Sequence, residues 1–137
     1  MSRLENHTAI VTGSSSGIGR AIAQRFASEG AYVLLADRVE ETRGGGETTL
    51  DLIKQSGGAA DYLQTNVANW DDLSACVEHV IAQHGRLDIM VNNAAIGAGG
   101  RLTETTEAEW DETMAVNLKG VFFGCKVAAQ QMLNQEP

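Results

Sequence analysis

The sequence contains little cysteine and little histidine, and neither residue type forms a recognisable set of ligands. Cys76 and Cys125 are far apart and lie in helical patterns, without the paired spacing of a zinc or redox site. We therefore expect both to be reduced thiols in the core. His7, His79 and His84 form no metal-ligand pattern, so we expect no metal site.

Positive charge and long apolar runs are also scarce. The 10 Lys and Arg residues stand against 18 Asp and Glu residues, and the formal net charge of -8 disfavours nucleic acid or an anionic membrane surface as a partner. The N-terminal segment lacks the apolar core of a signal peptide, and no stretch reaches the length of a membrane span. These features predict a cytoplasmic chain. Its 137 residues, 43% of them apolar, can form a single domain over residues 1–137 without disulfides or metals.

A glycine-rich run, Thr12–Gly19, directly follows the apolar stretch Ala9–Val11 and predicts a strand that turns into a helix around a phosphate group. Gly13 allows a sharp exit from the strand, because glycine adopts positive φ without steric cost. Gly17 lets the backbone approach a pyrophosphate, and Gly19 lets the helix pack closely on the sheet. A bland Gly/Ser turn would be the alternative if this run stood alone.

The same run supplies hydrogen-bond donors. Ile18 begins the expected helix, whose free N–H groups and positive dipole end face the anion, and Ser14, Ser15 and Ser16 add hydroxyl groups. The candidate cofactor-binding residues here are Thr12, Gly13, Ser15, Ser16, Gly17, Ile18 and Gly19.

The segment after this run completes a βαβ unit. Apolar residues recur at helical spacing up to Gly30, and the continuous apolar run 31–36 predicts a buried parallel strand. Asp37 follows this strand, where an acid can accept hydrogen bonds from an adenosine ribose. The alternative for Asp37 is a solvated loop acid.

Asp37 also bears on the choice of cofactor. A carboxylate that faces the ribose hydroxyls would repel the 2′-phosphate of NADP, so Asp37 favours NAD. Arg38 and the nearby Arg43 are the complication, because a guanidinium could pair with that phosphate. We give Asp37 more weight and predict that NAD binds at least tenfold tighter than NADP, a gap of roughly 1.4 kcal/mol.

The rest of the chain alternates strands and helices. The sequence predicts a helix in the second half of 38–56, after a glycine loop at 44–46, and then a strand over 59–64 near the sheet edge. A helix should follow from a capping box at Asn69 and Asp72 to Gly85, and then a strand over 87–91. The last helix should run from a capping box at Thr106 and Glu109 almost to the terminus. This alternation predicts a doubly wound α/β fold of the Rossmann type, with a parallel sheet in the order 3-2-1-4. A ligand should lie across the carboxyl ends of the first and fourth strands, between residues 13–19 and 92–96.

Taken together, these residues resemble a known family, the classical branch of the short-chain dehydrogenase/reductases. The resemblance covers the whole chain and rests on Thr12–Gly19, Asp37, Asn66-Val67, Asn92–Ala95 and Val116–Gly120. It implies an NAD(P)-dependent oxidoreductase that moves a hydride between the nicotinamide and a small-molecule alcohol or carbonyl substrate.

The resemblance also implies roles for single residues. Asn66 would meet the adenine amino group and Val67 would lie beside the ring, although a simple Asx turn at Asn66 is an alternative. Asn93 and Ala94 would line the ribose and the path to the nicotinamide, with Asn92 as a fold-stabilising hydrogen-bonder. Ala95, which stands where the family usually has glycine, Ile96 and Val116 complete the implied cofactor site.

Asn117 resembles the asparagine of the family's catalytic tetrad, and a buried core amide is the alternative. The serine, tyrosine and lysine of that tetrad fall beyond Pro137 in the family pattern, and neither Tyr32 nor Tyr62 has a lysine four residues later. The 137 residues alone are therefore expected to be inactive, a portion of the family domain that stops before the fifth strand.

That expectation has consequences for association. It makes the strand 87–91 an exposed apolar edge, and the last helix is apolar on more than one side, which predicts a homo-oligomer through this helix. The alternatives to the oxidoreductase are a non-catalytic NAD-binding module and an interaction module.

Overall fold

One parallel sheet forms the centre of the molecule in the computed structural model, which describes residues 2–97 and 99–136. Its strands are β1 (Thr8–Thr12), β2 (Tyr32–Asp37), β3 (Ala59–Gln64) and β4 (Ile89–Val91). They pair in the order β3-β2-β1-β4, with Thr8 opposite Tyr32 and Ala9 opposite Ile89. The predicted doubly wound fold and strand order are confirmed, including the place of β3 at an edge.

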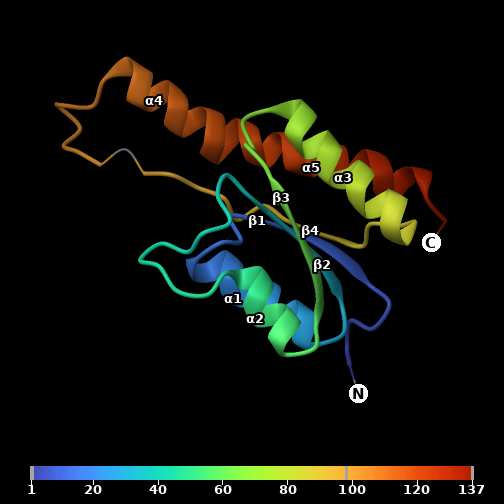
Figure 1. Ribbon diagram of the computed structural model, residues 1–137. Helices are drawn as coiled ribbons and strands as arrows, with labels where there is room; N and C mark the ends of the chain where they lie inside the picture. The colour runs from blue at the N-terminus through green and yellow to red at the C-terminus, as the bar shows by residue number, and fades with distance from the viewer. Residues whose placement is uncertain (1, 98, 137) are drawn as a thin grey trace.

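Helices cover both faces of this sheet (Figure 1). They are α1 (Gly17–Ser28), α2 (Thr49–Gln55), α3 (Trp70–His84), α4 (Glu107–Met114), the π-helix η1 (Ala115–Lys119) and α5 (Gly120–Asn134). Figure 1 shows α1 and α2 on one face and α3 and α5 on the other. The predicted last helix is thus one long rod in which α4, η1 and α5 are continuous, and its π-helical segment was not predicted.

The central strands β1 and β2 are buried on both faces, so their side chains alternate between two cores. Ile10 and Leu34 point to the α3 and α5 side, whereas Val11 and Val33 point to the α1 and α2 side. All four side chains are fully buried. This packing fixes the register of β1 against β2, and with it the position of the loops that follow both strands.

The glycines at 44–46 lie in a loop, as predicted, and α2 begins only at Thr49. Their φ angles are 89°, 83° and 95°, a left-handed region that a helix cannot include. The loop between β2 and α2, residues 38–48, is therefore long, and we call it the arginine loop after Arg38 and Arg43.

One of the two predicted capping boxes is wrong. Thr106 and Glu109 form a reciprocal box, but the Asn69 side chain accepts from Asp71 N at 2.9 Å, and Asp72 does not reach back to Asn69. The Asp72 carboxylate instead accepts from Asn66 N at 2.8 Å. A hydrogen bond from Asn69 N to Asn66 O closes the tight turn before α3. This turn directs the Asn66 N–H toward the start of the helix.

The prediction for the thiols is half right. Cys76 is fully buried in α3, and its burial raises the pKa of the thiol, so it stays protonated. Cys125 is exposed on α5, so its assignment to the core is wrong.

Candidate functional site

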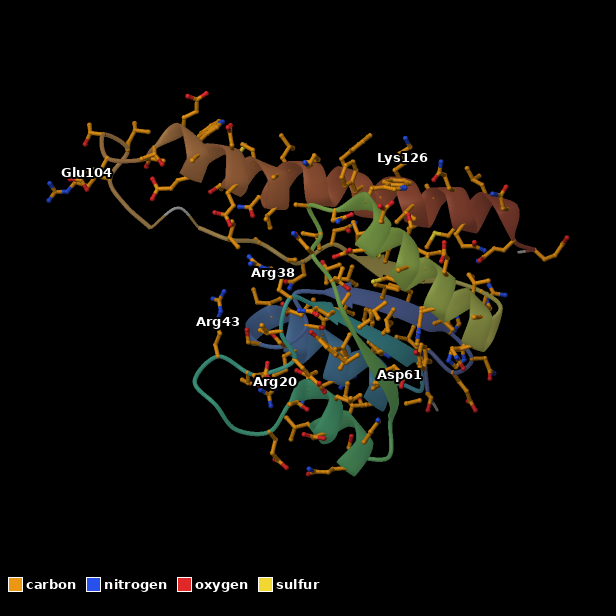
Figure 2. The ribbon with its side chains drawn as sticks, turned by 45° about the horizontal axis from the view of Figure 1, so that its top comes forward. Arg20, Arg38, Arg43, Asp61, Glu104 and Lys126 are labelled. Atoms are coloured by element: carbon orange, nitrogen blue, oxygen red, sulfur yellow. The ribbon has the colours of Figure 1, made fainter. Side chains whose placement is uncertain are left out.

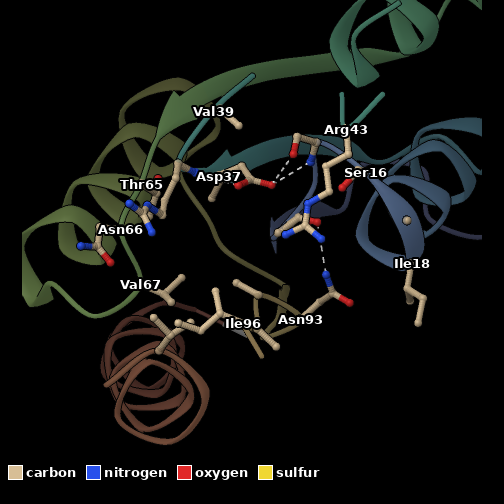
Figure 3. Close-up of a pocket in the computed structure, with 18 residues that line it drawn as sticks. Ser16, Ile18, Asp37, Val39, Arg43, Thr65, Asn66, Val67, Asn93 and Ile96 are labelled. Atoms are coloured by element: carbon tan, nitrogen blue, oxygen red, sulfur yellow. Dashed lines mark hydrogen bonds between the residues drawn. The ribbon is translucent and has the colours of Figure 1, made fainter. Parts of the chain in front are cut away.

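A pocket of about 580 Å³ opens at the carboxyl ends of the strands, within the size range of ligand sites (Figure 3). It lies between the loops that follow β1, β2, β3 and β4, which is where a doubly wound sheet binds its ligand. The residues that line it are Gly13, Ser15, Ser16, Gly17, Ile18, Ala36, Asp37, Arg38, Val39, Arg43, Thr65, Asn66, Val67, Asn93, Ala94, Ala95, Ile96 and Val116.

The glycine loop, residues 13–19, forms one wall of this pocket. Gly13 and Gly17 have φ angles of 65° and 57°, so both sharp bends require glycine. A Cβ at Gly17 would meet no protein atom within 4 Å, and the space that it would fill belongs to the pocket. A Cβ at Gly19 would lie 2.6 Å from Asn93 Nδ2 and would also overlap the Gly13 carbonyl oxygen. Gly17 thus keeps the pocket open, and Gly19 keeps the loop folded.

Helix α1 presents its amino end to the pocket. Its first hydrogen bond runs from Arg20 N to Ser16 O at 3.3 Å, so the N–H groups of Gly17, Ile18 and Gly19 have no acceptor within the helix. Ser16 is the N-cap and makes no side-chain cap bond. The apolar Ile18 side chain is 73% exposed beside it. This wall can bind an anion through backbone donors alone.

The three serines of the glycine loop have different surroundings. Ser14 was predicted to add a donor to the pocket, but its side chain is fully buried and its hydroxyl has no partner among the described residues. The bend at Gly13 turns Ser14 toward α2, where its carbonyl accepts from Thr49 Oγ1 at 2.8 Å. Ser15 Oγ donates to Asp37 at 2.7 Å, and Ser16 lines the pocket.

Asp37 lies at the end of β2, where it lines the pocket (Figure 3). Its Oδ2 accepts from Ser15 N at 2.9 Å and from Ser15 Oγ at 2.7 Å, and its Oδ1 accepts from Arg38 N at 2.7 Å. An ionised carboxylate has about four acceptor positions, so Asp37 keeps room for one further donor. These bonds hold the carboxylate in place at the pocket wall.

Thr12 ties β1 to β4 behind the pocket. Its hydroxyl donates to Val91 O at 3.2 Å and accepts from Asn93 N at 2.9 Å and Ala94 N at 3.0 Å. The Asn93 side chain in turn donates to Thr12 O at 3.0 Å and Gly13 O at 3.2 Å. Thr12 itself is buried and does not line the pocket.

The structural role predicted for Asn92 thus lies mainly with Asn93, which also lines the pocket. Asn92 Nδ2 instead approaches Cys125 Sγ at 3.4 Å. The close fit of Gly124 against Asn92 explains this, because a Cβ at Gly124 would meet the Asn92 amide.

Asn66 and Val67 line the pocket opposite the glycine loop (Figure 3). The Asn66 side-chain oxygen accepts from Ala68 N at 3.1 Å, which is the Asx turn that the sequence left open. Val67 is buried, and Gly120 packs so closely on it that a Cβ would lie 2.8 Å from Val67 Cγ2. The start of α5, directly after the π-helical segment, is therefore held against this side of the pocket.

Asn117 does not line the pocket and acts on it through Ile96. Its Oδ1 accepts from Ile96 N at 2.8 Å, and its Nδ2 donates to Ile96 O at 2.7 Å. Asn117 lies in η1, and Ile96 lines the pocket. In this structure Asn117 is a half-buried amide that positions the backbone after β4.

The two tyrosines lie away from the pocket. The Tyr62 hydroxyl donates to the Asp37 carbonyl at 3.0 Å, and burial followed by the charges of Asp37, Glu40 and Glu41 raises the pKa of Tyr62. The Tyr32 hydroxyl donates to Asp61 at the other end of the sheet, where burial and this bond raise its pKa. Each hydroxyl therefore stays protonated.

Most of the predicted cofactor-binding residues line this one pocket, and the exceptions are Thr12 and Gly19, which lie behind it. The lining residues outside the predicted set are Ala36, Val39, Arg43 and Thr65, of which Arg43 was considered only as a partner for a 2′-phosphate. Ala36 is the next-to-last residue of β2 and Thr65 directly follows β3, so their place at the carboxyl ends was a usable signal. Within residues 2–97 and 99–136 no group of His, Cys, Asp or Glu could hold a metal, and no described helix has the length and apolar character needed to cross a bilayer.

Comparison with known proteins identifies the family. The family model described as short chain dehydrogenase matches residues 7–137. The chain belongs to this family. A Thermotoga maritima protein named as an uncharacterized oxidoreductase is 44% identical over 126 residues, which are 92% of this chain and 48% of that protein. The 3-oxoacyl-(acyl-carrier-protein) reductase FabG of Staphylococcus aureus is 41% identical over 128 residues, which are 93% of this chain and 51% of that protein.

Solved structures of short-chain dehydrogenases have the same fold. A short-chain dehydrogenase/reductase from Burkholderia xenovorans superposes with a TM-score of 0.89 at 34% identity, over 98% of this chain and 54% of that one. A metagenomic short-chain oxidoreductase in complex with NADP gives 0.84 at 38% identity, over 96% of this chain and 58% of that one. This chain spans about half the length of these relatives.

Proposed function

We propose that this chain carries the nicotinamide dinucleotide site of an oxidoreductase that acts on an alcohol or carbonyl substrate. The observation that carries the proposal is the open space at Gly17, next to the free N–H groups of α1 and opposite Asn66 and Val67. A pyrophosphate fits the backbone donors of the glycine loop, and a ribose hydroxyl fits the free acceptor position of Asp37. The family membership supports the same ligand.

The residues of this chain hold and orient the cofactor. When bound, the cofactor supplies hydride transfer at its nicotinamide ring. The glycine loop would bind the pyrophosphate, Val67 would lie beside the adenine, and Ala94 to Ile96 would line the path to the nicotinamide. Asn117 holds that path in place through Ile96. The 137 residues contain no tyrosine followed by a lysine four residues later, so we propose that on their own they bind cofactor without turning over substrate.

The preferred cofactor in this proposal is NAD. The Asp37 carboxylate is fixed by Ser15 at the pocket wall, so it would repel a 2′-phosphate. A calorimetric titration of the chain should give a dissociation constant for NAD at least tenfold below that for NADP, a gap of roughly 1.4 kcal/mol.

A matched pair of variants tests whether Asp37 causes this preference. Asp37→Asn should bring the two dissociation constants close together, whereas Asp111→Asn, on the exposed side of α4, should leave their ratio unchanged. Equal affinities in the unaltered chain would refute the preference for NAD. Binding of neither nucleotide would refute the proposed site.

The exposed side of the last helix supports a proposal of self-association. Leu118 and Phe122 are one turn apart and are 66% and 58% exposed. We propose that this surface joins copies of the chain in a homo-oligomer. Sedimentation should show an oligomer that the double variant Leu118→Ser, Phe122→Ser dissociates, and a monomer of the unaltered chain would contradict the proposal.

A further inference from the structure

The arginine loop brings guanidinium groups to an otherwise acidic molecule. Figure 2 shows Arg20, Arg38 and Arg43 on one side of the molecule, and Arg38 and Arg43 both line the pocket. Figure 3 shows Arg43 extending from its loop across the pocket toward the glycine loop. This loop crosses from β2 to α2, so its backbone does not belong to the glycine run that predicts the phosphate site.

These arginines differ from the others in their partners. The arginines that pair with carboxylates elsewhere are Arg3, Arg25, Arg86 and Arg101. Among the described residues, no carboxylate lies within ion-pair distance of Arg38 or Arg43. This contrast is informative in a chain with a formal net charge of -8, because acidic partners are abundant.

Arg43 is held in place through its neighbour Thr42. The Thr42 hydroxyl has two acceptors within reach, Glu47 O at 3.1 Å and Ser15 O at 3.2 Å, and it accepts from Arg20 Nη1 at 2.8 Å. Arg20 Nη2 also donates to Glu47 O at 2.8 Å. The contact of Thr42 with Ser15 joins the arginine loop to the glycine loop just before Arg43. The bond from Arg20 to Glu47 joins it to α1 just after the glycines at 44–46. We call these bonds of Arg20 and Thr42 the latch.

We propose that Arg43 binds a phosphate group of the dinucleotide and that the latch positions it for this contact. The inference rests on the proposed function, because it assigns a residue to that same pocket. A guanidinium binds phosphate through a planar pair of N–H donors, so Arg43 supplies a charged contact where the glycine loop supplies only backbone dipoles. Two groups of the dinucleotide offer phosphate oxygens that accept from a guanidinium, namely the pyrophosphate and the 2′-phosphate of NADP.

Titration of Arg43→Gln with NAD and with NADP separates these two sources. Loss of about tenfold in affinity for both nucleotides would assign Arg43 to the pyrophosphate, and loss for NADP alone would assign it to the 2′-phosphate. Arg101→Gln is the control, because Arg101 is a highly exposed arginine outside the pocket, and it should leave both affinities unchanged.

A double-mutant cycle of nucleotide affinities tests whether the latch acts through Arg43. Arg20→Gln should weaken binding about threefold in the unaltered chain and should have no effect in the Arg43→Gln background, since it acts through Arg43. Thermal melting of each variant checks that it is folded. If Arg43→Gln binds both nucleotides as tightly as the unaltered chain does, the Arg43 proposal fails while the proposed function stands. If the unaltered chain binds neither nucleotide, both fail.

Discussion

The glycine loop and the arginine loop face each other across one pocket, and they are held in place by different means. The glycine loop is fixed by its own backbone, through the bends at Gly13 and Gly17 and the contact of Gly19 with Asn93. The arginine loop makes a left-handed turn at 44–46, where an added Cβ would meet no atom within 4 Å, and side-chain bonds to other elements fix it. The first loop therefore presents backbone N–H groups, and the second presents charged side chains.

This difference separates shape from charge in the pocket. Changes to the glycine loop should alter whether the site exists at all, because no alternative residue fits its backbone. Changes to the arginine loop should alter how strongly and how selectively the site binds, because its Arg38 and Arg43 side chains line the pocket while the strands and the glycine loop form the rest of the wall.

The largest effect is expected at Gly19. A methyl group there would overlap the Gly13 carbonyl oxygen and lie 2.6 Å from Asn93 Nδ2, and all of these groups are fixed by β1 and β4. Gly19→Ala should lower the free energy of unfolding by about 3 kcal/mol or prevent folding. Urea unfolding followed by circular dichroism measures this. Stability equal to that of the unaltered chain would show that the loop is less rigid than its contacts indicate.

Gly17→Ala is expected to act on binding more than on folding. Its φ of 57° costs an alanine about 1–2 kcal/mol, but no protein atom lies within 4 Å of the new methyl group, which enters the pocket. NAD affinity should fall at least tenfold in the calorimetric titration. Gly57→Ala is the matched control, because Gly57 has a φ of 80° and open space but lies outside the pocket. Equal losses in both variants would mean that backbone strain, not the filled pocket, weakens binding.

The smallest effect is expected at Thr49, which joins α2 to the glycine loop. Its buried hydroxyl donates to Ser14 O at 2.8 Å and lies 3.3 Å from Ser15 O. Thr49→Val keeps the shape and removes these bonds, which should lower the free energy of unfolding by about 1 kcal/mol. Thr103→Val, at an exposed position, should have no effect in the same urea experiment. A null result at Thr49 would show that α2 does not brace the glycine loop.

The sequence predicted the glycine loop better than the arginine loop, for a physical reason. The spacing of Gly13, Gly17 and Gly19 constrains the backbone locally, and the strand order then determines which loops meet. The place of Arg43 depends on bonds between Arg20 and Thr42, 22 residues apart, which no local pattern encodes.

The same reason explains the other differences. The buried hydroxyl of Ser14 without a hydrogen-bond partner, and the hydrogen bonds of Asn117 to Ile96, arise from contacts between distant segments of the described chain. The π-helical turn that carries Asn117 has no signal in the spacing of apolar residues. Cys125 fits a helical apolar pattern, yet it lies on the exposed side of α5.

The central claim is that the backbone of the glycine loop, assisted by the arginine loop, holds a nicotinamide dinucleotide in this pocket. An amide-resolved NMR titration with NAD tests it most directly, because each N–H group reports its own surroundings. We expect the largest shifts at Gly17 and Ile18, smaller shifts around Arg43, and none at Asp61, which does not line the pocket. Saturable shifts centred elsewhere, or no shifts at millimolar NAD, would contradict it.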